Sequence, residues 1–259
     1  MGATPEVHIF QDLRELAIDA ADLFTWLGGQ AISKTGRFHV ALSGGSTPET
    51  LYTTLVRDYG ARVDWAKVQF FFGDERCVPP SHPESNFGRA NASLFLPLQI
   101  PPAHIHHMMR GEEDPETAAR EYAKTLATVL NVSHDQFPRF DLILLGLGQD
   151  GHTASLFPGT RAVNEGVQWV VPGTAPSGIH ARLTLTLNVI NHAAVILFLV
   201  AGRDKAGITR AVLEPAPADT SRYPASFVRP EQGRVLWFID EAASAELAVS
   251  KQKISSREE

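Results

Sequence analysis

The sequence is poor in cysteine and in long apolar runs. Cys77 is its single cysteine, so no disulfide can form within the chain. The apolar stretch at residues 193–201 comes nearest to a membrane span, and it is well short of the roughly 18 residues that a transmembrane helix needs. The beginning of the chain, MGATPEVHIF, lacks the basic and apolar regions of a secretory signal. We therefore predict a cytoplasmic protein without a membrane partner.

Basic residues are scarce as well. The formal net charge is -6 at pH 7, and no run of lysine and arginine is longer than two residues. A protein that binds the phosphate backbone of a nucleic acid needs a basic face, so no nucleic-acid partner is expected. A small anionic ligand remains compatible with this charge, because a few local groups decide its binding. We predict a monomer or a weak dimer that binds a small molecule.

What the chain does contain is an alternation of short apolar runs with helical patterns. The apolar runs, each predicted as a strand, cover residues 7–10, 38–42, 68–72, 140–145, 195–200 and 235–239. The helical patterns begin near residue 12 and recur near residues 48–58, 86–95, 115–130, 203–213 and 241–248. Continuous hydrophobicity within a strand indicates burial on both faces, which is typical of a parallel sheet. The pattern predicts a doubly wound α/β fold, with a mostly parallel sheet and helices on both of its faces.

Two further segments, at residues 169–171 and 182–187, are predicted as strands of a small subsidiary sheet. No linker rich in proline, glycine or serine divides the chain, and the proline-rich stretch at 214–224 is interpreted as an ordered surface loop. We therefore expect a single α/β domain over residues 1–259.

A turn rich in glycine and hydroxyl side chains follows the apolar run at 38–42. Its residues are Ser43, Gly44, Gly45, Ser46 and Thr47. Pro48 comes next, at the expected first position of a helix. Backbone N–H groups in such a turn point toward one place, and the positive end of the helix favours an anion there, so the turn is a candidate phosphate site. The alternative is an ordinary turn in which a serine or threonine caps the helix.

Three charged residues, Asp74, Glu75 and Arg76, follow the apolar run at 68–72. Charged groups at the end of a buried strand are often functional, because loops at strand ends carry binding and catalytic groups. Asp74 is a candidate for orienting a water or a sugar hydroxyl, and Arg76 for binding a phosphate or an oxyanion. Glu75 is expected to be only a solvated neighbour.

The apolar run at 140–145 leads into a glycine-rich bend that contains Asp150 and His152. Imidazole changes its charge near neutral pH, which suits a general base, and Asp150 is placed to fix its tautomer. Arg182 opens one predicted strand and Lys205 follows another, so both cations are candidates for the same anion. The alternatives are an ordinary surface histidine and two surface charges.

Other motifs are interpreted as coincidences. Gly146, Gly148 and Gly151 form a GxGxxG pattern, but a proline at position 158 and the position in mid-chain argue against a dinucleotide site. The histidines at residues 104–107 fit a strand with a polar side better than a metal site, since no HExxH motif is present. Cys77 is interpreted as a packing residue. No cofactor and no metal are expected.

Together these motifs resemble those of the 6-phosphogluconolactonase family. The matching segments occur in the family's order, at residues 42–52, 71–86, 141–159, 182–187, 202–205 and 235–243. The resemblance implies hydrolysis of 6-phospho-D-glucono-1,5-lactone to 6-phosphogluconate, a step of the oxidative pentose phosphate pathway, without a required cofactor.

The residues support this chemistry, because a lactone is an activated ester that needs only a positioned base and an oxyanion partner. Our hypothesis is that His152 deprotonates the water that attacks C1 and then returns the proton to the ring oxygen. Asp150 or Asp74 would hold the imidazole or the sugar. Arg76 would stabilise the developing oxyanion or share the phosphate, which would rest on residues 43–47 with Arg182 and Lys205.

Two alternatives remain. The related glucosamine-6-phosphate deaminases share the SGGSTP motif, but their histidine motif continues into Ala-Phe-Asn-Glu-Pro, whereas this chain has ASLFP at residues 154–158 and lacks that glutamate. A non-catalytic sugar-phosphate sensor, like the effector domains of transcription regulators, should carry a DNA-binding segment. Too few residues precede the first predicted strand to form one.

Overall fold

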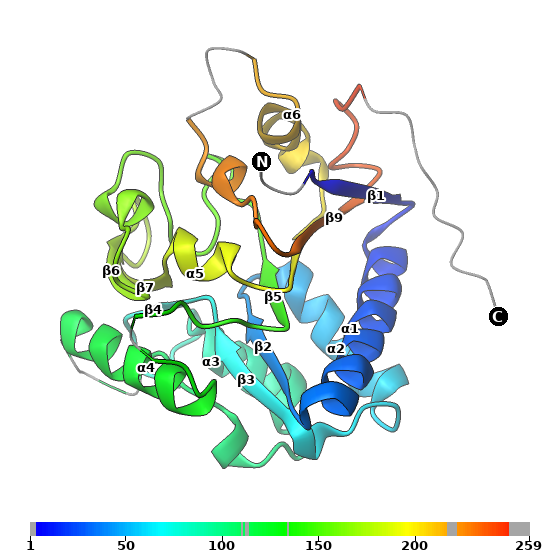
Figure 1. The fold of residues 1–259 in the computed structure, drawn as a ribbon. Coiled ribbons are helices and arrows are strands. Elements are labelled where there is room, and N and C mark those ends of the chain that lie inside the picture. The colour runs from blue at the N-terminus through cyan, green and yellow to red at the C-terminus, as the bar shows by residue number, and fades with distance from the viewer. Residues whose placement is uncertain (1–3, 110, 112–113, 134, 217–221, 249–259) are drawn as a thin grey trace.

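The computed structural model describes residues 4–109, 111, 114–133, 135–216 and 222–248 (Figure 1). Within these residues, six strands form one parallel sheet in the order β1-β9-β8-β5-β2-β3. Their bounds are β1 Glu6–Phe10, β2 Phe38–Leu42, β3 Val68–Phe72, β5 Leu142–Leu145, β8 Val195–Val200 and β9 Arg234–Asp240. The predicted parallel sheet is confirmed, and the predicted bounds at 38–42, 68–72 and 195–200 match those of β2, β3 and β8.

Helices flank this sheet. They are α1 Leu13–Thr35, α2 Ser46–Tyr59, α3 Asn86–Ala90, α4 Pro115–Val129, α5 Leu187–Asn191 and α6 Ala206–Leu213. Figure 1 shows α1 and α2 together on one side of the sheet, and α4 on the opposite side. The side chain of Asp12 caps α1 by accepting from Glu15 N, and Gly36 ends that helix in the left-handed conformation. The sequence therefore sets both ends of the longest helix locally.

A second, antiparallel sheet has the order β4-β7-β6. Its strands are β4 Asp74–Arg76, β6 Val170–Thr174 and β7 Ala181–Leu185. The predicted subsidiary sheet is thus confirmed. In Figure 1 it lies beside the large sheet with α4 packed against it. Its strand β4 follows β3 after a single residue, Gly73, whose N–H donates to Leu42 O of the large sheet and whose carbonyl accepts from Leu185 N of the small one.

Several predictions about element bounds are corrected. The charged residues after the strand at 68–72 were expected in a loop, but they form β4, because the chain enters the small sheet after Gly73. The strand predicted at 182–187 ends at Leu185, and α5 begins at Leu187. The helix predicted at 86–95 is α3 followed by one π-helical turn, Asn91–Phe95. Residues 217–221 of the proline-rich stretch lie outside the described residues, and within the rest Pro224–Phe227 forms a 3-10 turn.

The helix predicted at 241–248 is wrong. Residues 241–246 form turns, although the Asp240 carboxylate accepts from Ala243 N as an N-cap would. The backbone bonds that follow are Ser244 N to Asp240 O and Leu247 N to Ser244 O, so the ladder of i+4 bonds that a helix needs does not continue. The same carboxylate also accepts from Gly202 N, which ties the end of β9 to the segment after β8.

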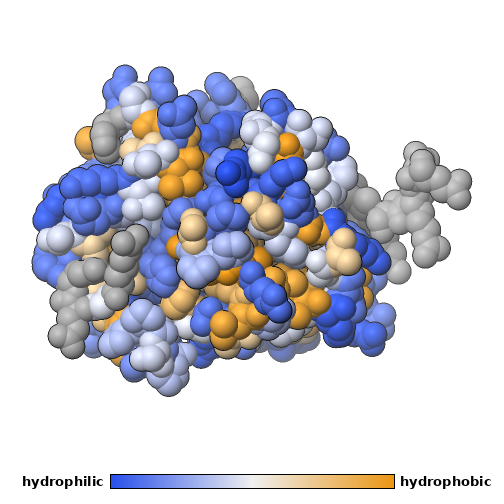
Figure 2. Space-filling model, turned by 90° about the horizontal axis from the view of Figure 1, so that it is seen from below, coloured by the Kyte–Doolittle hydropathy of each residue, from blue (hydrophilic) through white to orange (hydrophobic). Residues whose placement is uncertain are grey.

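One buried apolar cluster joins both sheets and the helices. Phe198 and Trp237 stack at its centre with ring centroids 3.9 Å apart. Figure 2 shows apolar residues gathered in the lower middle of the face seen from below, among hydrophilic ones. No described helix is long and apolar enough to cross a bilayer. The single domain and the cytoplasmic location stay predictions.

Candidate active site

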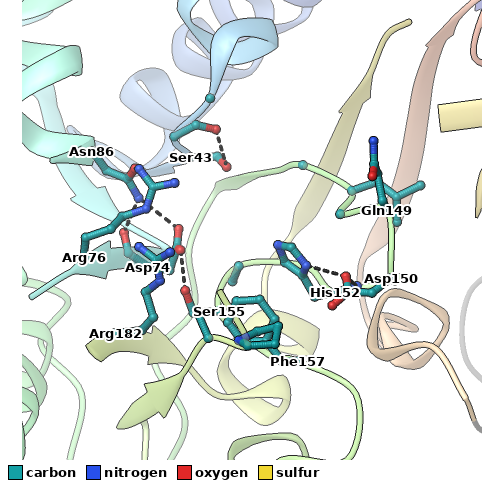
Figure 3. Close-up of a pocket in the computed structure, with 18 of the residues that line it drawn as sticks. Ser43, Asp74, Arg76, Asn86, Gln149, Asp150, His152, Ser155, Phe157 and Arg182 are labelled. Carbon is teal, nitrogen blue, oxygen red and sulfur yellow. Dashed lines mark hydrogen bonds and ion pairs between the residues drawn. The ribbon is translucent and has the colours of Figure 1, made fainter. Parts of the chain in front are cut away.

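A pocket of about 630 Å³ opens where β2, β3, β5 and β8 end (Figure 3). Ligands of open α/β sheets bind at the carboxyl ends of the strands, so the location itself marks a candidate site. Figure 3 shows two groups of side chains that face each other across the pocket. The arginine side consists of Asp74, Arg76, Asn86 and Arg182, and the histidine side of Gln149, Asp150, His152 and Lys205.

The glycine bend, Ser43 to Gly45, lines the pocket between these two sides. Tyr52, which is fully buried in α2, donates to Ser43 O at 2.7 Å and accepts from Ser43 N at 3.2 Å. A Cβ atom on Gly44 would lie 1.9 Å from Asn86 Oδ1, so only glycine fits there. Tyr52 therefore holds the bend through its hydrogen bonds to Ser43, and Asn86 occupies the space beside Gly44.

The helix behind the bend begins at Ser46 and has Gly45 as its N-cap, at φ 104° and without a side-chain cap hydrogen bond. The predicted position of Pro48 is wrong, since it is the third helical residue rather than the first. The alternative interpretation, a turn in which a serine or threonine caps the helix, does not hold either. Uncapped N–H groups keep the positive end of α2 available to an anion. Ser46 and Thr47 lie in the first turn of α2 and do not line the pocket.

On the arginine side, Asp74 and Arg76 lie in β4, and Arg182 pairs with Arg76 across the ladder to β7. The Asp74 carboxylate accepts from Ser155 Oγ at 2.6 Å and from Asn86 Nδ2 at 3.1 Å. Two neighbouring strands of the small sheet therefore bring charged groups to the same wall. The Asp74 carboxylate is held in one orientation by its two hydrogen-bond donors.

Arg182 is the most unusual charge in the pocket. It is 7% exposed, and its Nε and Nη1 atoms have no hydrogen-bond partner among the described residues. Burial, followed by the nearby positive charge of Arg76, lowers the pKa of Arg182. The Asp74 carboxylate nearby opposes this lowering of the pKa, but two atoms of the guanidinium stay without hydrogen bonds, which is unfavourable in the interior. An anion in the pocket would supply a counter-ion.

Glu75 does not behave as predicted. It is 2% exposed rather than solvated, because β4 turns its side chain away from the pocket mouth and under the loop that leads to α3. The carboxylate accepts from three backbone N–H groups and one hydroxyl. Burial raises the pKa of Glu75, and these hydrogen bonds oppose the rise.

His152 lies in a tight loop after β5. Gly148 N donates to His152 O at 2.8 Å, and Thr153 Oγ1 donates to Gly146 O at 2.9 Å. These two hydrogen bonds join the end of the loop to its beginning. A Cβ atom on Gly148 would lie 2.0 Å from the imidazole Nδ1. Gly148 is therefore required for the ring to cross this part of the backbone.

The His152 ring is oriented by a carboxylate. Its Nδ1 lies 2.5 Å from Asp150 Oδ1, and because an ionised carboxylate only accepts, Nδ1 carries the proton and Nε2 keeps its lone pair. The ring packs near Phe157, with centroids 4.4 Å apart. Figure 3 shows the imidazole directed into the pocket. The geometry expected for a base oriented by Asp150 is thus present, with the His152 side chain 31% exposed.

Lys205 reaches the pocket from the histidine side. It ends the 3-10 turn Arg203–Lys205, which Gly202 begins with φ 101°. The Gln149 amide donates to Asp204 Oδ2 at 3.1 Å, and Lys205 Nζ lies 3.8 Å from the same oxygen. The structure therefore brings Arg182 and Lys205 to one pocket, with the glycine bend between them.

Asn86, Ser155 and Gln149 belong to the site but were not predicted. Each lies inside a motif that was singled out, yet a single sequence gives no sign that an amide or hydroxyl will face inward. Among the described residues, no three histidine, cysteine, aspartate or glutamate side chains gather where they would hold a metal. Burial raises the pKa of Cys77 to about 11, which fits a packing residue better than a nucleophile.

The glycine pattern at 146–151 and the histidines at 104–107, both interpreted as coincidences, have structural roles. The glycines at 146, 148 and 151 belong to the turn around His152 and open no helix, unlike a dinucleotide fingerprint. The strand expected at 104–107 is reduced to one bridge, between Ile105 and Phe70, because the 3-10 turn Pro102–His104 occupies its beginning.

A family model described as glucosamine-6-phosphate isomerases/6-phosphogluconolactonase matches residues 11–237. The chain belongs to this family. A 6-phosphogluconolactonase of Synechocystis is 43% identical over 243 residues, which cover 94% of this chain and 98% of that protein. The structure of a 6-phosphogluconolactonase from Trypanosoma cruzi superimposes with a TM-score of 0.84 at 29% identity, over 96% of this chain and 99% of the other.

A monomeric glucosamine-6-phosphate deaminase has the same fold, with a TM-score of 0.73 at 23% identity over 93% of this chain and all of the other. Since both branches of the family share the fold, only the residues of the site can separate the two activities.

Proposed function

We propose that this protein hydrolyses 6-phospho-D-glucono-1,5-lactone to 6-phosphogluconate, with His152 as the general base. The observation that carries the proposal is that an imidazole oriented by Asp150 faces the same pocket as the buried, unpartnered Arg182. The similarity to 6-phosphogluconolactonases over nearly the whole chain supports it. The reaction requires no cofactor.

The phosphoryl group would bind at the glycine bend, where the N–H groups that begin α2 favour an anion. Arg182 and Lys205 would contact it from the two sides of the pocket. This placement gives the buried positive charge of Arg182 a counter-ion. It also extends the sugar from the bend toward His152.

In the chemical step, His152 Nε2 takes a proton from a water molecule as the water oxygen bonds to C1. The carbonyl oxygen becomes an oxyanion, which Arg76 is placed to stabilise, unless its guanidinium binds the phosphoryl group instead. The bond between C1 and the ring oxygen then breaks, and the imidazolium returns the proton to that oxygen. His152 is neutral again, and the product is the open-chain acid.

The deaminase alternative has less support in the site. Deamination moves a proton between C1 and C2 of an amino sugar, and the related enzymes carry a glutamate in the histidine loop. In that loop Ser155 instead donates to Asp74, and Phe157 packs against the His152 ring. Release of ammonia from glucosamine 6-phosphate would reveal this activity.

The test is to generate the lactone in situ from glucose 6-phosphate and to compare its decay with wild type and with His152→Ala. We expect the variant to lose roughly 10²–10⁴-fold in kcat, the usual contribution of a general base. His192→Ala, an exposed histidine outside the pocket, is the matched control and should retain full activity. Equal acceleration by His152→Ala would show that the base is misassigned, and a wild type without acceleration would overturn the function.

A further inference from the structure

Glu75 is a buried carboxylate that the proposed chemistry does not use. Its Oε1 accepts from Arg76 N and from Asn86 N, each at 2.7 Å. Its Oε2 accepts from Phe87 N at 2.8 Å and from Ser85 Oγ at 3.2 Å. Four donors thus converge on two oxygens, and three of them belong to the segment that begins α3. A charge this well satisfied in the interior indicates a specific task.

The segment that Glu75 holds carries Asn86 into the pocket. Asn86 is 3% exposed, and its Nδ2 donates to the Asp74 carbonyl at 2.9 Å and to the Asp74 carboxylate. The same amide fills the space beside Gly44 that a Cβ would need. A shift of Asn86 would therefore be felt by β4 and by the glycine bend together.

The same segment also grips Arg76. Arg76 Nη1 donates to the Glu84 carbonyl at 2.6 Å and to Asn86 Oδ1 at 2.9 Å. Nη1 carries two N–H bonds, so both of its donors are used by the segment. The Nε–H and the Nη2 donors form the opposite edge of the guanidinium, and this edge matches the two oxygens of a phosphate or an oxyanion. The two hydrogen bonds of Nη1 therefore set the direction in which the Nε–Nη2 edge of Arg76 points.

We infer that Glu75 is a positioning residue, which fixes the segment Glu84 to Asn86 and through it the anion-binding edge of Arg76. Glu75 touches no substrate and acts only through Asn86 and Arg76. The inference rests on the proposed function for the identity of the anion, and on the hydrogen bonds above for the mechanism of positioning.

Glutamine is an informative replacement at this position. Both carboxylate oxygens accept from two donors, whereas an amide offers one acceptor atom and one NH₂ group. With its NH₂ group in the place of Oε1, the amide meets the N–H groups of Arg76 and Asn86. Turned the other way, it meets Phe87 N, while the Ser85 hydroxyl can rotate to accept from it. Glu75→Gln therefore keeps the volume of the side chain but loses at least one backbone hydrogen bond in either orientation.

The experiment compares wild type, Glu75→Gln, Arg76→Ala and the double variant, all in the full chain. If Glu75 positions Arg76, Glu75→Gln lowers kcat/KM by about tenfold or more, the usual effect of losing a hydrogen bond to a charged group. The loss falls on the same parameter, KM or kcat, that Arg76→Ala changes. In the Arg76→Ala background the second substitution then has a much smaller effect, which comes from Asn86 and the glycine bend alone.

Asp12→Ala is the matched control, because it removes a capping carboxylate from α1, outside the pocket. It should lower the unfolding temperature and leave kcat and KM per folded enzyme unchanged. If Glu75 only stabilised the fold, Glu75→Gln would behave like Asp12→Ala, and its loss would multiply with that of Arg76→Ala. Either result would overturn the inference.

Binding of 6-phosphogluconate and of inorganic phosphate, measured by calorimetry on the same four proteins, separates this inference from the proposed function. A wild type that fails to hydrolyse the lactone rejects the function. The inference then stands if Glu75→Gln and Arg76→Ala weaken anion binding to a similar degree without adding in the double variant. It falls if Glu75→Gln binds both anions as the wild type does, or if the two losses multiply.

Discussion

The arginine side and the histidine side of the pocket differ in burial and in the number of hydrogen bonds that hold them. On the arginine side, Asp74 and Arg182 are 8% and 7% exposed and lie on paired strands. On the histidine side, the Asp150 and His152 side chains are 40% and 31% exposed and lie on a turn. Anion binding is strengthened by charged groups that are held rigidly and shielded from water, whereas a base that activates water must stay accessible to solvent.

This difference separates two uses of charge. Arg182 is unfavourable as long as the pocket is empty, and it becomes favourable when an anion enters. His152 is already paired with Asp150, so its side is satisfied without a ligand. Substitution of Arg182 should therefore lower the affinity for the anion without lowering stability, and substitution of Asp150 or His152 should change the rate alone.

The largest of three further effects is expected for Arg182→Met. Loss of a buried charged donor costs roughly 1.5–3 kcal/mol of binding, so KM for the lactone should rise about 10- to 100-fold. Because the substitution also removes an unpartnered buried charge, the ligand-free protein should unfold at the same temperature as wild type or higher. Steady-state kinetics and thermal unfolding check the two parts, with the exposed Arg14→Met as control. A variant with a lower unfolding temperature and an unchanged KM would show that Arg182 stabilises the fold and does not bind the anion.

Asp150→Asn should have an intermediate effect. Its amide no longer requires the proton to be on Nδ1, so Nε2 is the free base in only part of the molecules. The pair is half exposed, and water replaces part of the lost interaction, so we expect kcat to fall about tenfold with KM unchanged. Kinetics at several lactone concentrations separate the two parameters. A rise in KM with constant kcat would show that Asp150 binds the substrate and does not orient the base.

Tyr52→Phe should have the smallest effect, because Tyr52 holds the glycine bend by neutral hydrogen bonds. Each such bond contributes about 1 kcal/mol, which corresponds to roughly a fivefold rise in KM. Binding of inorganic phosphate by calorimetry is the direct measurement. A Tyr52→Phe protein with wild-type phosphate affinity would show that the bend keeps its shape without support from beneath.

The same tyrosine gives a prediction for alkaline pH. Burial raises the pKa of Tyr52, so the neutral phenol is favoured in the folded state. Its contribution to stability is therefore complete below the ordinary tyrosine pKa of about 10 and is lost as the pH rises above that value. Unfolding temperatures measured between pH 8 and pH 11 should fall less steeply for Tyr52→Phe than for wild type.

Much of the large sheet could be predicted because its strands are short runs of apolar residues, and such runs are buried on both faces of a parallel sheet. β4 was missed as a strand because three charged residues resemble a strand end, and only the tertiary ladder to β7 makes them a strand. The burial of Glu75 has the same origin, since its partners come from a segment about ten residues later. The glycine bend and the His152 loop could be singled out as candidates because their glycines and polar side chains are local features of the sequence.

Gly73 makes one backbone hydrogen bond to each sheet, so it fixes the place where β4 leaves the large sheet. The distance of Asp74 and Arg76 from the glycine bend therefore depends on how the two sheets pack against each other. We expect a substitution in that packing, far from the pocket, to change how well a ligand fits.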